Sequence, residues 1–270
     1  MKSFYLGVRA VLLGLLVVAA SFIPRRAAAN DDVTSPRNAD VSASGAKSVR
    51  IEAAGGILRV EGRSGINEVR VRGTARADRK SRLDGIKLIA ERRGDEVFIK
   101  ADMPEWRDRD WFDRDHEFVA LDLVIEVPIS LRLDVSDGSG EAEFNNTGSI
   151  ELGDGSGEIK IRNARGDVRV SDGSGSITIE GVEGSVRVND GSGSITARNV
   201  TGNFVVTSDG SGDIDVSGIG GTMRVENDGS GNIDVERVTG DFVVEHDGSG
   251  GIRYDTVKGS VRIPERKRRS

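Results

Sequence analysis

The chain has 270 residues, 38 of them Lys or Arg and 44 Asp or Glu, and contains no Cys. Its formal net charge of −6 argues against nucleic acid as a partner, because phosphate binding needs a dense cationic surface. The lack of Cys excludes disulfides, thiolate metal sites and a lipid-attachment cysteine. The 36 Gly and an aromatic content of 4% are typical of an all-β chain with many tight turns.

Residues 1–29 resemble a secretory signal peptide. A positively charged start precedes an apolar run over residues 10–23, and three alanines ending at Ala29 resemble a cleavage site. Arg25 and Arg26 are unusual at this place and leave open an uncleaved anchor, although the apolar run is short for a membrane span. We expect cleavage near Ala29, export to the periplasm or the medium, and no transmembrane span in the mature chain.

The next part of the chain consists of two segments that differ in composition. Residues 30–47 are polar and lack periodicity, which predicts a disordered linker. Residues 48–135 contain several short alternating apolar runs and are β-rich but irregular, and Gly94-Asp95 between two of these runs predicts a hairpin. We expect residues 48–135 to form an N-terminal cap on the repeats that follow, as terminal units of solenoids do.

A charged segment within this cap region holds both tryptophans of the chain. Trp106, Trp111 and Phe112 are interspersed with Arg and Asp residues, and exposed aromatics beside arginines suit a contact with a protein or glycan. Alternatively, these rings fold back as a lid over the cap. We expect partner binding to depend on these three residues first.

The tetrapeptide Asp-Gly-Ser-Gly occurs seven times at intervals of 17 to 19 residues, and a further glycine lies midway between successive copies. Such a period indicates a repeat architecture. Each repeat therefore consists of strand, turn, strand and turn. The tetrapeptides begin at Asp137, Asp154, Asp172, Asp190, Asp209, Asp228 and Asp247. The central structural turn glycines are Gly173, Gly175, Gly191, Gly193, Gly210 and Gly212.

Between the turns, apolar and polar residues alternate, as in the run from Ile177 to Ile179, which indicates strands buried on one face. Burying five apolar side chains per repeat contributes ~7–15 kcal/mol, whereas ordering ~18 residues costs ~18–36 kcal/mol of backbone entropy. No repeat can fold alone, so the repeats must stack ~4.8 Å apart. Because parallel crossover connections are nearly always right-handed, we predict an all-β, right-handed parallel β-helix (β-solenoid) of about seven 17–19-residue coils over 136–263, followed by a basic tail at 264–270.

One outward column of the predicted coils is mainly basic and contains Arg169, Arg187 and Arg224. It indicates a surface for an anion or an acidic polysaccharide. The alternative is a solvated face whose arginines pair with nearby acids. These three arginines are our second set of candidate binding residues.

The repeated aspartates also allow two interpretations. Stacked carboxylates could bind calcium between coils, with Asp172, Asp190 and Asp209 as weak candidates. Alternatively, each carboxylate accepts a backbone N–H in its own turn and gains ~1.5–3 kcal/mol, which exceeds the ~1 kcal/mol repulsion between neighbours in water-like surroundings. Turn capping therefore explains the aspartates without a metal.

Catalysis has little support in the sequence. The only histidines are His116 and His246, and no base is placed opposite the repeated serines. We expect neither an enzyme nor a cofactor.

Residues Glu126 to Pro128, followed by Leu131 to Val135 and by coils of the form Gly-Ser-Gly-x-Ile-x-Val, resemble the bacterial putative-adhesin family of secreted β-helical proteins, a domain of unknown function. The likeness covers roughly Ser48 to Ile263. It implies a β-helix fold and an envelope location, and it brings no catalytic residues. We therefore expect a non-catalytic adhesin-like binding or scaffold module that contacts an envelope or surface protein or glycan; the alternative is a polysaccharide-binding or polysaccharide-active β-helix protein.

Overall fold

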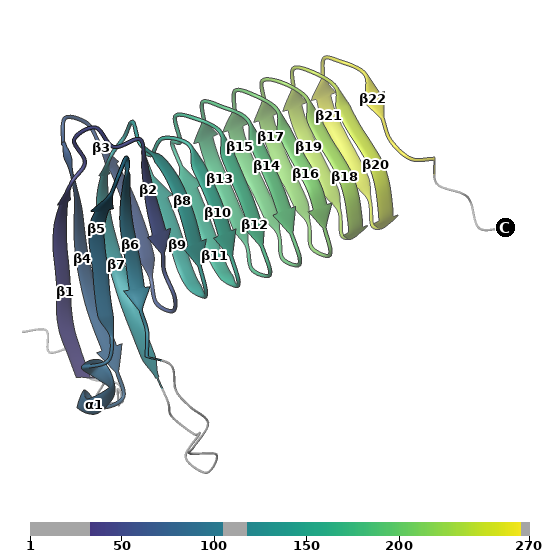
Figure 1. Cartoon of the computed structure of the whole chain (residues 1–270). Coiled ribbons are helices and arrows are strands. Elements are labelled where there is room, and N and C mark those ends of the chain that lie inside the picture. The colour runs from purple at the N-terminus through teal and green to yellow at the C-terminus, as the bar shows by residue number, and fades with distance from the viewer. Residues whose placement is uncertain (1–32, 105–117, 266–270) are drawn as a thin grey trace, which may run out of the picture. The chain divides into compact units, whose positions relative to one another are not determined.

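The computed structural model describes residues 33–104 and 118–265, and these described residues belong to one compact unit. Within it the chain forms two eleven-stranded sheets (Figure 1). Sheet A consists, in order, of β1 (Val33–Ser42), β4 (Glu68–Ala77), β7 (Val119–Pro128), β3 (Leu58–Arg63), β9 (Gly140–Asn145), β11 (Gly157–Arg162), β13 (Ile177–Val182), β15 (Ile195–Val200), β17 (Ile214–Ile219), β19 (Ile233–Val238) and β21 (Ile252–Val257). Sheet B consists of β22 (Val261–Arg262), β20 (Phe242–Ser249), β18 (Met223–Ser230), β16 (Phe204–Asp209), β14 (Val186–Asp190), β12 (Val168–Asp172), β10 (Ile150–Asp154), β8 (Arg132–Asp137), β2 (Ser48–Glu52), β6 (Glu96–Asp102) and β5 (Lys87–Arg93).

The two sheets are joined by the repeats. Each tetrapeptide connects a strand of sheet B to a strand of sheet A, and the midway glycine lies in the return to sheet B. Successive coils pair in parallel, so that Val168 lies opposite Val186 and Ile177 lies opposite Ile195. The result is a β-solenoid of about seven turns with about 19 residues per turn, as the sequence predicts.

The core consists of columns of like residues between the sheets. Ile159, Ile177, Ile195, Ile214 and Ile233 are each at most 1% exposed and stack in register. Their burial confirms the inward columns that the alternation predicts.

Tyr254 occupies the inward register position opposite Val235 and lies 5.8 Å from the ring of Phe242. It is nevertheless 48% exposed, because β21 is the last described strand of sheet A.

The tetrapeptide glycines let neighbouring coils touch. A Cβ atom at the first glycine, as in Gly173, Gly191 and Gly210, would overlap a backbone oxygen of the preceding coil. At the second glycine, as in Gly175, Gly193 and Gly212, the overlap is closer and φ lies between 135° and 140°. This conformation is rarely adopted by residues with a side chain.

The N-terminal part differs from the predicted linker. Val33–Ser42 is a strand that pairs antiparallel with β4 along its whole length, so the prediction of disorder over 30–47 is wrong for these residues. Its side chains alternate between half-buried and exposed. Backbone pairing with β4 holds this polar strand in place, and Pro36, which has no N–H to donate, is tolerated because β1 is an edge strand.

The cap region continues the stack instead of forming a separate layer. β2 pairs parallel with β8, and β3 pairs parallel with β9, so the boundary expected at residue 135 falls inside β8. The predicted hairpin is present: Gly94, with φ of 61°, joins the antiparallel strands β5 and β6. A single short helix, α1 (Lys80–Leu83), follows β4 in the described part of the chain.

Three predicted features lie outside the described residues: the signal peptide over 1–29, the aromatic residues Trp106, Trp111 and Phe112, and the basic end of the chain after Glu265. Among the residues that are described, no helix has the length and apolar character needed to cross a membrane.

Candidate binding site

The outer face of sheet B carries two neighbouring columns of very different size. Along a strand, residues two apart point to the same side, so Glu151 and Gly153 both face outward from β10. The first column continues as Arg169 and Arg187, and the second as Ser171 and Asn189. A row of long charged side chains thus runs beside a row of small ones.

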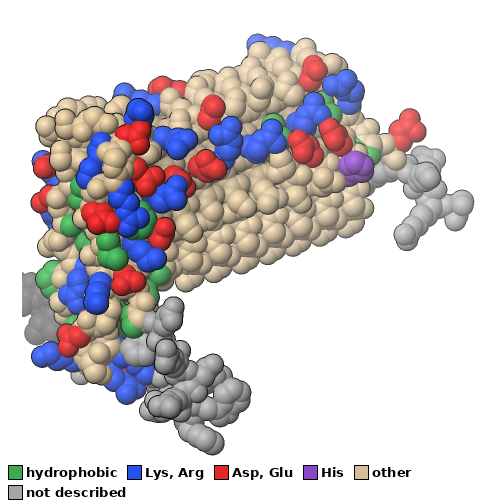
Figure 2. All heavy atoms as spheres, in the orientation of Figure 1, with side chains coloured by type: hydrophobic (Ala, Val, Ile, Leu, Met, Phe, Trp, Pro, Cys, Tyr) green, Lys and Arg blue, Asp and Glu red, His purple; other side chains and the backbone are tan. Residues whose placement is uncertain are grey.

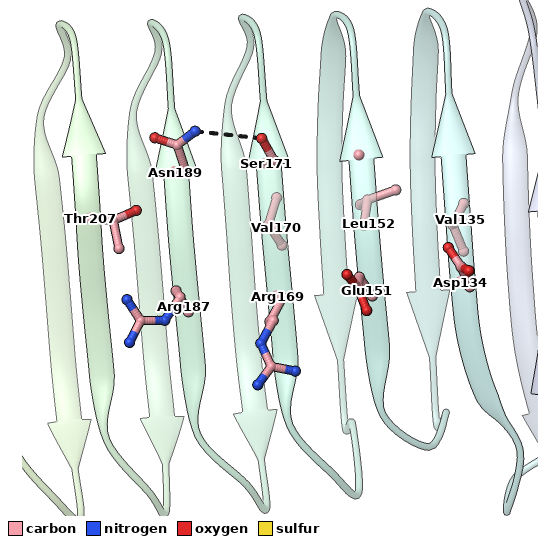
Figure 3. Close-up of a pocket in the computed structure, with 11 residues that line it drawn as sticks. Asp134, Val135, Glu151, Leu152, Arg169, Val170, Ser171, Arg187, Asn189 and Thr207 are labelled. Carbon is pink, nitrogen blue, oxygen red and sulfur yellow. Dashed lines mark hydrogen bonds between the residues drawn. The ribbon is translucent and has the colours of Figure 1, made fainter.

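A groove of about 390 Å³ lies between these columns (Figure 3). Gly153 leaves part of it open, since a Cβ at this position would have no atom within 4 Å. Ser171 and Asn189, neighbours in the second column, contact each other with 3.5 Å between Asn189 Nδ2 and Ser171 Oγ. The polar lining residues are Asp134, Glu151, Arg169, Ser171, Arg187, Asn189 and Thr207.

The groove ends where the repeat lengthens. The interval between tetrapeptides grows from 18 to 19 residues at Asp209, and the extra residue produces a register shift between β14 and β16, after Val188. Thr207 is the inserted residue, and its hydroxyl donates a 3.0 Å hydrogen bond to the carbonyl oxygen of Val188. The bulge therefore places a polar side chain at the end of the groove.

The charges around the groove are unequally matched. Asp134 is paired with Arg50 at 2.9 Å, and Arg187 has only a long contact of 3.7 Å with Glu226. Arg169 is exposed and forms no ion pair with any described residue. Arg169 and Arg187 also line an adjoining hollow of about 150 Å³. Figure 3 shows both arginines side by side on adjacent coils.

The three predicted arginines differ in their positions relative to the groove and in their ion pairs. Arg169 and Arg187 are adjacent and share the groove, whereas Val205 stands between Arg187 and Arg224 in the column. Arg224 forms an ion pair with Glu245 and does not line the groove. Elsewhere, charged side chains of both signs form a band along the stacked coils, beside a broad surface without charge (Figure 2).

The repeated aspartates lie in a different environment from the one assumed from the sequence. They follow the inward residues of sheet B by two positions, and Asp172, Asp190 and Asp209 are 5%, 3% and 2% exposed, so water-like surroundings are the wrong description. Turn capping is present where Ser174 N–H donates to Asp172 and Ser192 N–H to Asp190, both at 3.2 Å. Neither oxygen of Asp209 forms a well-aligned hydrogen bond, although the Ser211 N–H lies near this carboxyl group. Among the described residues, no three acidic or imidazole groups are arranged to hold a metal ion.

Gly153 and Thr207 shape the groove and were not predicted from the sequence as site residues, although each left a signal there. Gly153 stands where the other coils carry Ser, Asn or, in the last coil, His before the aspartate, and Thr207 is the extra residue of the first 19-residue interval. Both departures from the repeat are visible in the sequence. Only the pairing register between adjacent coils shows that they lie at the groove.

A family model matches residues 114–270, which is more than half of the chain. The chain belongs to the Toastrack family DUF4097. This agrees with the resemblance to the putative-adhesin family that the repeats indicate. A comparison with curated proteins finds no match.

A comparison with solved structures finds similar chains from several bacteria. A putative adhesin from Bacteroides fragilis has 13% identity and a TM-score of 0.43, with 85% of this chain and 96% of that chain covered. A putative cell adhesion protein from Clostridium sporogenes has 10% identity and a TM-score of 0.35, with 86% and 100% covered. A putative lipid binding protein from Parabacteroides distasonis has 15% identity and a TM-score of 0.29, with 85% and 97% covered. At these TM-scores the likenesses do not bear on what this Toastrack protein binds.

Proposed function

We propose that this chain is a non-catalytic, adhesin-like binding module of the bacterial envelope, exported to the periplasm or the cell surface, and that it binds an anionic group of a surface ligand in the groove of sheet B. The observation that carries this proposal is Arg169, an exposed arginine at the groove that has no acidic partner among the described residues.

The geometry suits an anion. Each guanidinium group can donate two parallel hydrogen bonds to a carboxylate or phosphate, and Arg169 and Arg187 are adjacent in the same column. The neighbouring floor of Gly153 and Ser171 leaves room for the body of the ligand. Paired strands hold the backbones of both arginines in register, so binding needs to order only their side chains.

The groove favours such a ligand over a polysaccharide substrate. Its lining has no aromatic side chain among the described residues, so a sugar ring would find no flat apolar surface to stack on. Trp106, Trp111 and Phe112 remain a proposed second contact.

The proposal is tested by the retention of the purified protein on envelopes of the bacterium that produces it. We expect the double variant Arg169→Gln/Arg187→Gln to bind at least about tenfold more weakly, because two groups that form charge-assisted hydrogen bonds are lost. We also expect binding of the unchanged protein to weaken with added salt, because the contact is electrostatic.

The matched control is Arg198→Gln/Lys258→Gln, which removes the same charge from exposed positions outside the groove. Gly153→Leu should weaken binding by filling the groove while leaving the melting temperature nearly unchanged, since its Cβ meets open space. Equal binding by the groove variants and the control variant would contradict the proposed site.

A further inference from the structure

Six tetrapeptide aspartates form a continuous file inside the solenoid. They end successive strands of sheet B, lie opposite one another in register, and are between 2% and 7% exposed. We call them the aspartate file. Its members are Asp137, Asp154, Asp172, Asp190, Asp209 and Asp228.

The carboxyl oxygens of the file lack the partners that buried charges need. Both oxygens of Asp154, Asp209 and Asp228 are buried without a well-aligned hydrogen bond, and the other three members each have one such oxygen. The carboxyl group of Asp228 lies within hydrogen-bonding reach of that of Asp247 in the next coil. No Lys, Arg or His of the described chain forms an ion pair with a member of the file.

The groups that face the file are themselves acidic or neutral. Each member neighbours the aspartates of the adjacent coils, and Asp228 also faces Asp213 and Asp247. The remaining polar neighbours are backbone N–H groups of the turns, such as those of Gly138, Ser174 and Ser192. Several adjacent negative charges cannot stay buried in such a place without a compensating cation.

A proton is the cation that this geometry accommodates. When two carboxyl groups share a site, one keeps its proton, and it can donate a short, strong O–H hydrogen bond to the ionised neighbour. Coils ~4.8 Å apart place neighbouring carboxyl groups within reach of this arrangement. Each shared proton would also satisfy two of the oxygens that otherwise lack partners.

We propose that the aspartate file shares protons between adjacent coils, and that this protein is consequently more stable in mild acid than in mild alkali. This inference is independent of the ligand of the groove.

The pKa values of the file agree with this proposal. Burial, followed by the charge of the neighbouring aspartates, raises the pKa of Asp137 and Asp209 to about 7, and that of Asp190 and Asp228 to about 6. Since these values lie above the unfolded value of 3.8, the folded state holds more protons. The stabilisation is therefore complete below about pH 4 and is lost as the pH rises through about 6 to 7.

The test is thermal unfolding of the full chain in the presence of a chelator at about pH 5 and about pH 8. We expect the melting temperature to be lower at the higher pH by about 10 °C or more. The double variant Asp190→Asn/Asp209→Asn should melt higher than the unchanged protein at about pH 8 and should show a smaller pH dependence. Asn keeps the shape and the turn-capping oxygen and carries no charge.

The control Asp215→Asn/Asp255→Asn removes two exposed carboxylates from sheet A and should leave the pH dependence unchanged. A melting temperature that rises from about pH 5 to about pH 8, or an Asn double variant that melts lower at about pH 8, would overturn the proposal. Stabilisation by millimolar calcium that disappears in the Asn double variant would overturn it in favour of a metal.

An infrared measurement keeps the proposal testable if the variants do not fold. The unchanged protein at neutral pH should show the carbonyl band of protonated carboxylic acids, and the band should disappear as the pH is raised. Its absence at neutral pH would show that the file is fully ionised and would contradict the proposal.

Discussion

Val206→Asp is expected to prevent stable folding at room temperature. Val206 is fully buried in the middle of β16, between Val188 and Val225 of the adjacent coils. An unpaired charge at this position costs about 3–5 kcal/mol or more, a large part of the about 5–15 kcal/mol by which most proteins are stable. Circular dichroism and a thermal melt measure the loss directly.

The matched control for this substitution is Val205→Asp, one residue earlier. Val205 points outward between Arg187 and Arg224, so a carboxylate there gains opposite charges and the fold should be retained.

Removing the whole segment 190–208 should also leave a folded protein, because the coils on either side present the same columns to each other. Tolerance of Val206→Asp together with unfolding by the deletion would mean that the columns are wrongly assigned.

Gly193→Ala is expected to destabilise the solenoid by about 2–4 kcal/mol and to lower the melting temperature by about 5–15 °C. The residue has φ of 135°, and an added Cβ would overlap the carbonyl oxygen of Gly175 in the preceding coil. Neither the unfavourable φ angle nor the steric overlap can be relieved by a local shift, since both neighbouring coils are fixed by their own hydrogen bonds.

Gly153→Ala is the matched control, because this glycine has open space around its Cβ position and no positive φ. It should be neutral or slightly stabilising, as Ala restricts the unfolded chain. Equal losses of stability in the Gly153→Ala and Gly193→Ala variants would show that the tetrapeptide glycines are not needed for close contact between coils.

The stacked coils were predictable from the sequence because one short pattern recurs. Alternation of apolar and polar residues fixes which side chains face inward, and the tetrapeptide fixes where each strand ends. The burial of the aspartates was missed, although the same alternation contains it: Asp172 follows Val168 and Val170 at steps of two and therefore shares their inward face. Treating the tetrapeptide as a surface turn hid this signal.

Other features could not be derived from periodicity. β1 has few apolar residues, and its place at the edge of sheet A depends on backbone pairing with β4, which is independent of side-chain identity. The groove depends on the small side chains next to the arginines and on the bulge at Thr207. The sequence predicts the basic column, whereas only the register between coils distinguishes the unpaired Arg169 from Arg224, which is neutralised by Glu245.

The central claim is that sheet B carries the surface by which this protein binds the envelope. Site-specific photo-crosslinking tests it most directly, with a photoreactive side chain placed either at Ser171, in the groove, or at Thr178, on the outer face of sheet A in the same coil. On intact envelopes, the probe at Ser171 should yield a discrete crosslinked product that added salt diminishes, and the probe at Thr178 should not. The same product from both positions, or from Thr178 alone, would contradict the claim.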